Sequence, residues 1–195
     1  MSGRLSDHRL YIEIAGVIIS LIYLYLSIRQ HILLWPLGIL SAVMYVVVYF
    51  LTKFYADMGL NVYYIFVSIY GWIHWSKPPE NKAELPVTNL RIVHGLVLFG
   101  IFIILFVTMG ELLKRITDSP IPYWDALTTA GSVVATWMLT RKILQHWLVW
   151  VVVDLISMGL YIYRGLYPTV LLFAVYTAMA VVGFLQWRKS MKAPE

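Results

Sequence analysis

Residues 144–163 read LQHWLVWVVVDLISMGLYIY. The stretch has the length of about 20 apolar residues with which a helix crosses a lipid bilayer. Its interior holds one charged side chain, Asp154, directly after three valines. A carboxylate at the centre of a membrane helix costs about 2.5–3.5 kcal/mol on insertion scales, and such residues mark functional sites by default. The stretch therefore predicts a membrane helix that carries a polar function.

Two indoles accompany this carboxylate. Trp147, Trp150 and Asp154 are spaced i, i+3 and i+7, so they share one face of a helix. Indole faces attract cations by up to about 2 kcal/mol when water is excluded. If the face points into a bundle, it predicts a receptor for a flat cation. The alternative is that the indoles belong to an aromatic belt and that Asp154 is a structural hydrogen-bonding group.

Six further runs are similar in length and apolar character. Of the 195 residues, 61% are hydrophobic and 13% are charged, against about 45–50% and about 25% in an average soluble domain. This composition excludes a soluble globular domain and a disordered chain. Because backbone polar groups must be satisfied internally in lipid, we expect an all-α integral membrane protein with seven transmembrane helices. The expected helices are residues 10–28, 33–51, 58–75, 91–109, 123–139, 144–163 and 168–187.

The positive charges indicate an orientation. The net charge of +5 arises from residues between the apolar runs, which favours membrane orientation over nucleic-acid binding. One side carries Arg4, Arg9, Lys53, Lys114, Arg115 and Arg164. The other side carries Arg29, Lys77, Lys82, Arg91, Arg141, Lys142, Arg188, Lys189 and Lys192. The larger set predicts the cytoplasmic side, with the N-terminus outside and the C-terminus in the cytoplasm.

The chain also contains an internal repeat. Residues 11–77 align with residues 123–189 at a constant offset, without a gap. Identical pairs include Tyr11 and Tyr123, Ser20 and Ser132, Arg29 and Arg141, Trp35 and Trp147, Tyr49 and Tyr161, Tyr55 and Tyr167, Tyr64 and Tyr176, Gly71 and Gly183, Trp75 and Trp187, and Lys77 and Lys189. The repeat divides the chain into a first three-helix unit (1–77), a linker with the fourth helix (78–122) and a second three-helix unit (123–195).

This division predicts a 3+1+3 arrangement. Because the fourth helix inverts the chain once more, the two halves run parallel and are related by a pseudo-twofold axis along the membrane normal. Parallel repeats of this kind occur in secondary transporters, with the substrate site near the midplane. The repeat therefore favours a carrier, whose halves can rock about a central site. The alternative is a duplication retained only for folding.

The third expected helix offers partners for the indole and carboxylate face. Asn61, Tyr64 and Ser68 are again spaced i, i+3 and i+7. They could complete the substrate pocket from the other half. The alternative is polar packing between helices, which is worth about 0.6 kcal/mol per hydrogen bond.

Other chemistry is weakly represented. The chain has no cysteine, and its histidines form no i, i+4 pair. Gly131 and Ser132 lack the surrounding pattern of a serine hydrolase, and there is no phosphate-binding glycine loop. We expect no catalytic residue, no metal and no cofactor. A membrane enzyme or haem protein, and an interaction scaffold, remain the competing classes.

Several short motifs carry a family resemblance. They are YADMGLN at 55–61, YGW at 70–72, YWD at 123–125, TRK at 140–142 and Trp-x-x-Trp-x-x-x-Asp at 147–154. With them the chain resembles, over nearly its whole length, the PnuC family of bacterial vitamin transporters. In that family the last motif, with Asn or Asp at its end, is the substrate motif.

The resemblance implies a fold and a function. The fold would be three helices, a linker helix and three helices, similar to a full-length SWEET protein. The function would be uptake of nicotinamide riboside across the bacterial inner membrane by facilitated diffusion, with a cytoplasmic kinase that traps the substrate. Related members carry thiamine, and some are linked to riboflavin. Nicotinamide riboside members tend to have Gln at position 61 and Asn at positions 68 and 154, so thiamine stays open as the alternative. The sequence also leaves a homo-oligomer open.

Overall fold

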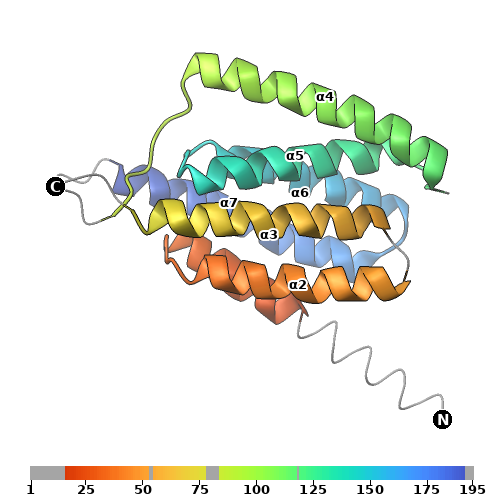
Figure 1. Ribbon diagram of the computed structural model, residues 1–195, viewed down its shortest axis with the longest axis horizontal. Helices are drawn as coiled ribbons and strands as arrows, with labels where there is room; N and C mark the ends of the chain where they lie inside the picture. Colours follow the sequence, from red (N-terminus) through yellow and green to blue (C-terminus); the bar gives the residue numbers. More distant parts are fainter. Residues whose placement is uncertain (1–15, 53–54, 78–83, 118, 192–195) are drawn as a thin grey trace, which may run out of the picture. The chain divides into compact units, whose positions relative to one another are not determined.

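The structure, a computed structural model, describes residues 16–52, 55–77, 84–117 and 119–191. The chain divides into two compact units, Met1–Ile73 and His74–Glu195, which are described separately below. The described residues form the helical segment Gly16–Ile28 and the labelled helices of Figure 1. These are α2 (Leu34–Thr52), α3 (Tyr55–Trp75), α4 (Ile92–Ile116), α5 (Pro122–Thr140), α6 (His146–Tyr163) and α7 (Tyr167–Ser190).

The all-helical expectation is confirmed, and the described residues add only one isolated β-bridge, between Thr88 and Ile143. Within the described ranges, four helices are long and apolar enough to cross a membrane: α2, α4, α6 and α7. α5 is less apolar because it carries many hydroxyl side chains. Thr129, Ser132 and Thr136 donate to the carbonyl four residues earlier, which satisfies each hydroxyl within the helix.

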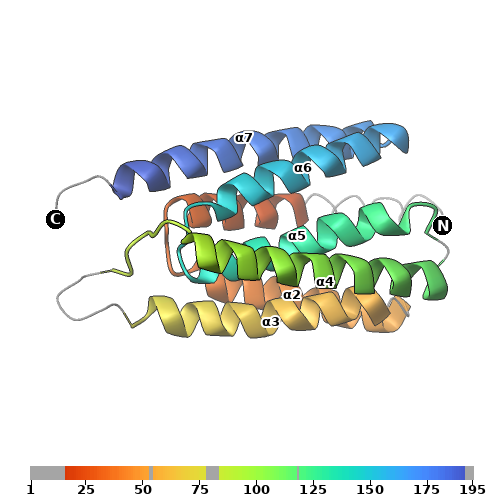
Figure 2. The ribbon, with the colours of Figure 1, turned by 90° about the horizontal axis from the view of Figure 1, so that it is seen from above.

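In the second unit, α5 is the central helix. It packs against α4 on one side and α6 on the other, and α6 packs in turn against α7 (Figures 1 and 2). α5 has the most buried residues of these helices, and they are mostly small, such as Ala126, Ala130 and Gly131. α4 instead exposes most of its large apolar side chains, as a helix does when one face meets lipid.

The helix boundaries differ most from expectation in α4. The expected end at residue 109 is wrong, because α4 continues to Ile116. Its last turns are polar, and Arg115 pairs with Glu111 at 3.8 Å. Lys114 and Arg115 also complement the negative end of the helix dipole. The polar residues after position 109 thus end the apolar run of α4, but the helix itself continues through them. Residues 10–15 of the first expected helix lie outside the described residues.

The connections before α2 and before α6 have the same backbone geometry. Gln30 (φ 55°) and Lys142 (φ 49°) both adopt the left-handed conformation, and they stand at matching positions of the sequence repeat. The hydrogen bonds match as well. Before α2, the backbone hydrogen bonds run from Gln30 N to Ser27 O, from His31 N to Leu26 O, from Leu34 N to His31 O and from Trp35 N to Ile32 O. The corresponding bonds before α6 run from Lys142 N to Leu139 O, from Ile143 N to Met138 O, from His146 N to Ile143 O and from Trp147 N to Leu144 O.

Each unit also contains the same tryptophan–glycine contact. A Cβ added to Gly71 would collide with the ring of Trp35, and one added to Gly183 would lie 2.6 Å from the ring of Trp147. Both indoles are fully buried. The glycine therefore lets a helix approach the indole closely, and the same solution occurs at matching positions of the two sequence halves.

This contact makes a stability prediction. We expect Gly183→Ala to lower the stability of the protein by about 1–3 kcal/mol, because the buried Trp147 ring cannot move aside without disturbing its neighbours. The matched control is Gly159→Ala on α6, where nothing lies within 4 Å of an added Cβ. That change should be neutral or stabilising. Thermal unfolding in detergent compares the two variants, and equal melting temperatures would contradict the packing argument.

Candidate functional site

α6 presents a polar group to the protein interior. Asp154 lies near the middle of α6, and its side chain is 5% exposed. Val153 and Ser157 beside it are buried as well, so this face of α6 points inward. Within the part of the chain that the structure describes, the carboxylate has no hydrogen bond or ion pair. A buried polar group without a partner lowers the stability of the protein. Such a group is therefore expected to have a function.

Trp147, on the same face of α6, lies in an aromatic cluster that we define as Trp75, His146, Trp147 and Trp187. The ring centroids of Trp147 and His146 are 4.5 Å apart, and those of Trp147 and Trp187 are 5.7 Å apart at an interplanar angle of 89°. Trp187 also contacts Trp75, with centroids 6.3 Å apart. The side chain of Trp147 is 1% exposed, so a ligand could stack on it only after this cluster had opened.

Two nitrogen atoms of the cluster are unusual. His146 Nε2 and Trp147 Nε1 are buried without a hydrogen-bond partner among the described residues, whereas His146 Nδ1 contacts Ile143 O at 2.8 Å. Trp75 Nε1 donates to Thr140 O at 3.0 Å. Ring packing thus holds His146, Trp147 and Trp187 together, and the hydrogen bond to Thr140 O holds Trp75.

The other predicted site residues differ in burial. Trp150 is half-buried on α6. On α3, Asn61 and Tyr64 are half-buried and Ser68 is buried. An added Cβ at Gly38 would lie 3.3 Å from the Ser68 hydroxyl and 3.1 Å from the ring of Tyr23, so these three residues meet inside the first unit. The α6 residues belong to the second unit, and each set is positioned within its own unit.

At the matching positions of the repeat, the sizes of the side chains are exchanged. Tyr23, Gly38 and Ser68 of the first unit correspond to Ala135, Trp150 and Ala180 of the second. Ala135 and Ala180 are fully buried. The position of the small Gly38 thus holds the large Trp150, and the positions of Tyr23 and Ser68 hold alanines. Asp154 likewise corresponds to Ala42, which is buried.

One charged residue was not singled out by the sequence. Lys142, in the connection before α6, is only 2% exposed. Its Nζ lies 4.5 Å from the centre of the Trp75 ring and 3.9 Å from Oε2 of the exposed Glu84. Burial lowers the pKa of Lys142 from 10.5 to about 8, and Glu84 partly opposes this shift. In the sequence, Lys142 contributes to the charge asymmetry and to the TRK motif at 140–142, and neither feature indicates that it is buried.

This burial predicts a pH-dependent stability. Between pH 8 and 10.5 the unfolded chain binds more protons at Lys142 than the folded chain, so the contribution of Lys142 to stability rises with pH in this window. We expect Lys142→Met to be more stable than the parent protein at pH 7, because it removes a buried charge and keeps the aliphatic chain. The difference in melting temperature should shrink above pH 8. A difference that stays constant from pH 7 to pH 10 would contradict the assignment.

The chain before α4 is fastened to the connection before α6. Thr88 N donates to Lys142 O at 2.9 Å, and Leu144 N donates to Thr88 O at 2.8 Å. Leu90 N donates to the Gln145 side chain at 2.8 Å, and Gln145 Nε2 donates to Asn89 Oδ1 at 3.0 Å. These bonds fix the residues that precede α4 against the start of α6.

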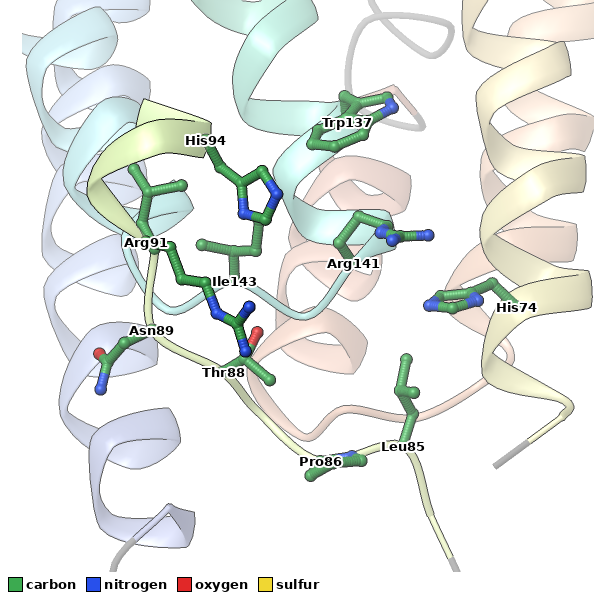
Figure 3. Close-up of a pocket in the computed structure, with 11 residues that line it drawn as sticks. His74, Leu85, Pro86, Thr88, Asn89, Arg91, His94, Trp137, Arg141 and Ile143 are labelled. Atoms are coloured by element: carbon green, nitrogen blue, oxygen red, sulfur yellow. The ribbon is translucent and has the colours of Figure 1, made fainter. Parts of the chain in front are cut away.

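A cavity of about 610 Å³ lies beside this attachment. Figure 3 shows side chains from the end of α3, the start of α4 and the end of α5 around it, including His74, Arg91, His94, Trp137 and Arg141. Sequence spacing gave no pair of histidines, but folding brings His74 and His94 to the same cavity. Only the fold could reveal this, because the two residues lie on different helices.

Comparison with known proteins identifies relatives. The model of the family described as "Nicotinamide mononucleotide transporter" matches residues 10–189. The nicotinamide riboside transporter PnuC of Escherichia coli (strain K12) is 25% identical over 207 residues, which cover 93% of this chain and 87% of the relative. The riboflavin/roseoflavin transporter RibM of Streptomyces davaonensis is 23% identical and covers 93% of this chain and 86% of its own length.

A solved structure supports the fold. The crystal structure of the vitamin B3 transporter PnuC matches with a TM-score of 0.69 and 21% identity, over 90% of this chain and 80% of that chain. The described helices, the four membrane-capable spans and the family match agree with one another. The chain is a multi-pass membrane protein and belongs to the nicotinamide mononucleotide transporter (PnuC) family, whose members are transporters and not enzymes.

Proposed function

We propose that this protein is a passive carrier for a cationic aromatic vitamin, with nicotinamide riboside as the substrate. Asp154 pairs with the positive charge or with the ribose hydroxyl groups. Trp150 stacks on the pyridinium ring, and Trp147 adds a second indole face in a state in which the aromatic cluster is open. Asn61, Tyr64 and Ser68 supply polar contacts from α3.

The observation that carries this proposal is the burial of Asp154 on the inward face of α6, without a partner among the described residues. A cationic ligand would supply the missing partner. The names of the relatives point to ligands with flat rings, namely nicotinamide riboside and riboflavin. Of these, nicotinamide riboside carries the positive charge that a buried carboxylate favours.

The proposed mechanism is alternating access between two three-helix halves in a 3+1+3 arrangement similar to that of SWEET proteins. The matching connections before α2 and α6 and the matching contacts of Trp35 with Gly71 and Trp147 with Gly183 support the repeat. We place the protein in the bacterial inner membrane with the N-terminus outside and the C-terminus in the cytoplasm. Because a passive carrier only equilibrates its substrate, net uptake would depend on a cytoplasmic kinase that phosphorylates it.

Transport into liposomes tests this function. Purified protein should equilibrate labelled nicotinamide riboside across the membrane without ATP or an ion gradient, and the rate should saturate with substrate. The internal concentration should stop at the external one. Accumulation above that level, or uptake no faster than in empty liposomes, would contradict passive carriage.

The same assay resolves the alternative substrates. Thiamine is also a flat cation, and riboflavin is a flat neutral ring, so both should be tested as competitors. The proposal expects nicotinamide riboside to compete best. Stronger competition by thiamine would keep the proposed site and change its substrate.

A further inference from the structure

We propose that the cavity at the start of α4 is a binding site for an organic phosphate, separate from the substrate site. The cavity of about 610 Å³ is large enough for a phosphate and an attached group. It lies wholly in the second unit, where α3 and α5 end and α4 begins. It is therefore at one end of the helices, and the excess of Lys and Arg predicts that this end is cytoplasmic.

The charges around the cavity favour an anion. Arg91 lines the cavity from the start of α4 and Arg141 from the end of α5, and in Figure 3 the Arg91 guanidinium lies beside Thr88 while that of Arg141 extends toward His74. Among the lining residues none is acidic. His74 and His94 add further nitrogen atoms to the lining. Arginine is suited to phosphate because its planar fork makes two parallel hydrogen bonds.

The first turn of α4 adds to this positive potential. Arg91 occupies the N-cap position with no side-chain cap, and the first turn contains no acidic residue. The Arg91 side chain makes no hydrogen bond or ion pair with another residue in the described ranges. Among the described residues, no acidic side chain neutralises the positive end of the α4 helix dipole. This partial charge adds to the positive charges of Arg91 and Arg141 at the cavity.

The rest of the wall is apolar and favours an ester over free phosphate. Leu85, Pro86, Trp137 and Ile143 line the cavity, and the Cζ of Arg141 is 5.9 Å from the centre of the Trp137 ring. A phosphate held by the arginines would leave its organic part against this surface. A phosphomonoester in solution and the headgroup of an anionic phospholipid share this chemistry.

Binding measurements on the full-length protein separate these sources. In nonionic detergent, calorimetry would compare AMP with adenosine and with inorganic phosphate. In nanodiscs, the melting temperature would be compared between phosphatidylcholine alone and phosphatidylcholine with phosphatidylglycerol. Each measurement would be made on the parent protein and on Arg91→Gln, Arg141→Gln and Arg115→Gln. Arg115 is the matched control because it lies at the other end of α4 and pairs with Glu111.

We expect AMP or phosphatidylglycerol to bind or stabilise the parent protein, with adenosine and phosphatidylcholine inactive. Arg91→Gln and Arg141→Gln should each weaken this effect about tenfold or more, because a charge-assisted hydrogen bond is lost, while Arg115→Gln changes it less than about twofold. A response to AMP alone assigns a soluble ester, and a response to phosphatidylglycerol alone assigns a lipid. No response to either probe, or equal effects of Arg91→Gln and Arg115→Gln, would overturn the proposal.

Discussion

Asp154→Ala is expected to abolish most transport and at the same time to make the protein more stable. Removing one partner of a buried charged contact costs about 2–5 kcal/mol, so substrate affinity should fall about 30-fold or more. The opposite effect on folding follows because a buried polar group without a partner costs about 1–3 kcal/mol. Alanine should fit, since the matching position in the first half is the buried Ala42.

The control for this prediction is Asp125→Ala. The Asp125 carboxylate accepts a hydrogen bond from Ser119 at 2.5 Å and pairs with Arg164 at 3.9 Å. It lies in the first turn of α5, where a negative charge is favourable. This variant should lose stability and keep transport. Uptake of nicotinamide riboside and thermal unfolding would be measured on both variants. Unchanged uptake in Asp154→Ala would remove this residue from the site.

Trp147→Ala and Trp150→Ala are expected to fail in different ways. Trp147 is fully buried among His146, Trp187 and Gly183, so its truncation should lower the stability by about 3–5 kcal/mol. Trp150 is half-buried, and its truncation should affect folding less. If Trp150 stacks on the cationic ring, its loss should weaken substrate binding by up to about 30-fold. This factor corresponds to the cation–π interaction of about 2 kcal/mol that would be lost.

Thermal unfolding and a substrate titration on each variant would test this pair. Trp147→Phe serves as the conservative variant, because it retains a ring in the aromatic cluster and should recover part of the stability. If Trp150→Ala unfolds as readily as Trp147→Ala and binds substrate normally, Trp150 is a packing residue and not a substrate-binding residue.

The fold could largely be predicted because the bilayer imposes strong constraints on sequence. Apolar runs of suitable length located each helix to within a few residues, apart from the extension of α4 to Ile116 and the part of the first helix outside the described residues. The extension was missed because hydropathy indicates which residues lie in the apolar layer of the membrane. It does not indicate where the backbone hydrogen bonds of the helix end. The Arg115–Glu111 pair shows how a helix continues into the polar layer.

The candidate site was predicted less completely. The spacing placed Trp147, Trp150 and Asp154 on one face of α6, and the structure buries Trp147 and Asp154 while Trp150 is half-buried. The spacing could not show that Trp147 lies in a cluster of aromatic rings, because Trp187 approaches Trp147, and Trp75 approaches Trp187, only through the fold. The buried Lys142 and the cavity between Arg91 and Arg141 were missed for the same reason.

The most direct test of the account is a binding titration that isolates the charge of the substrate. Nicotinamide riboside and its reduced form have nearly the same size, but only the oxidised form has a cationic ring. If Asp154 and the indoles form a receptor for a flat cation, the purified protein should bind the oxidised form about tenfold or more tightly, with one molecule per chain, and Asp154→Ala should remove the preference. Equal affinity for the two forms, or no saturable binding of either, would contradict it.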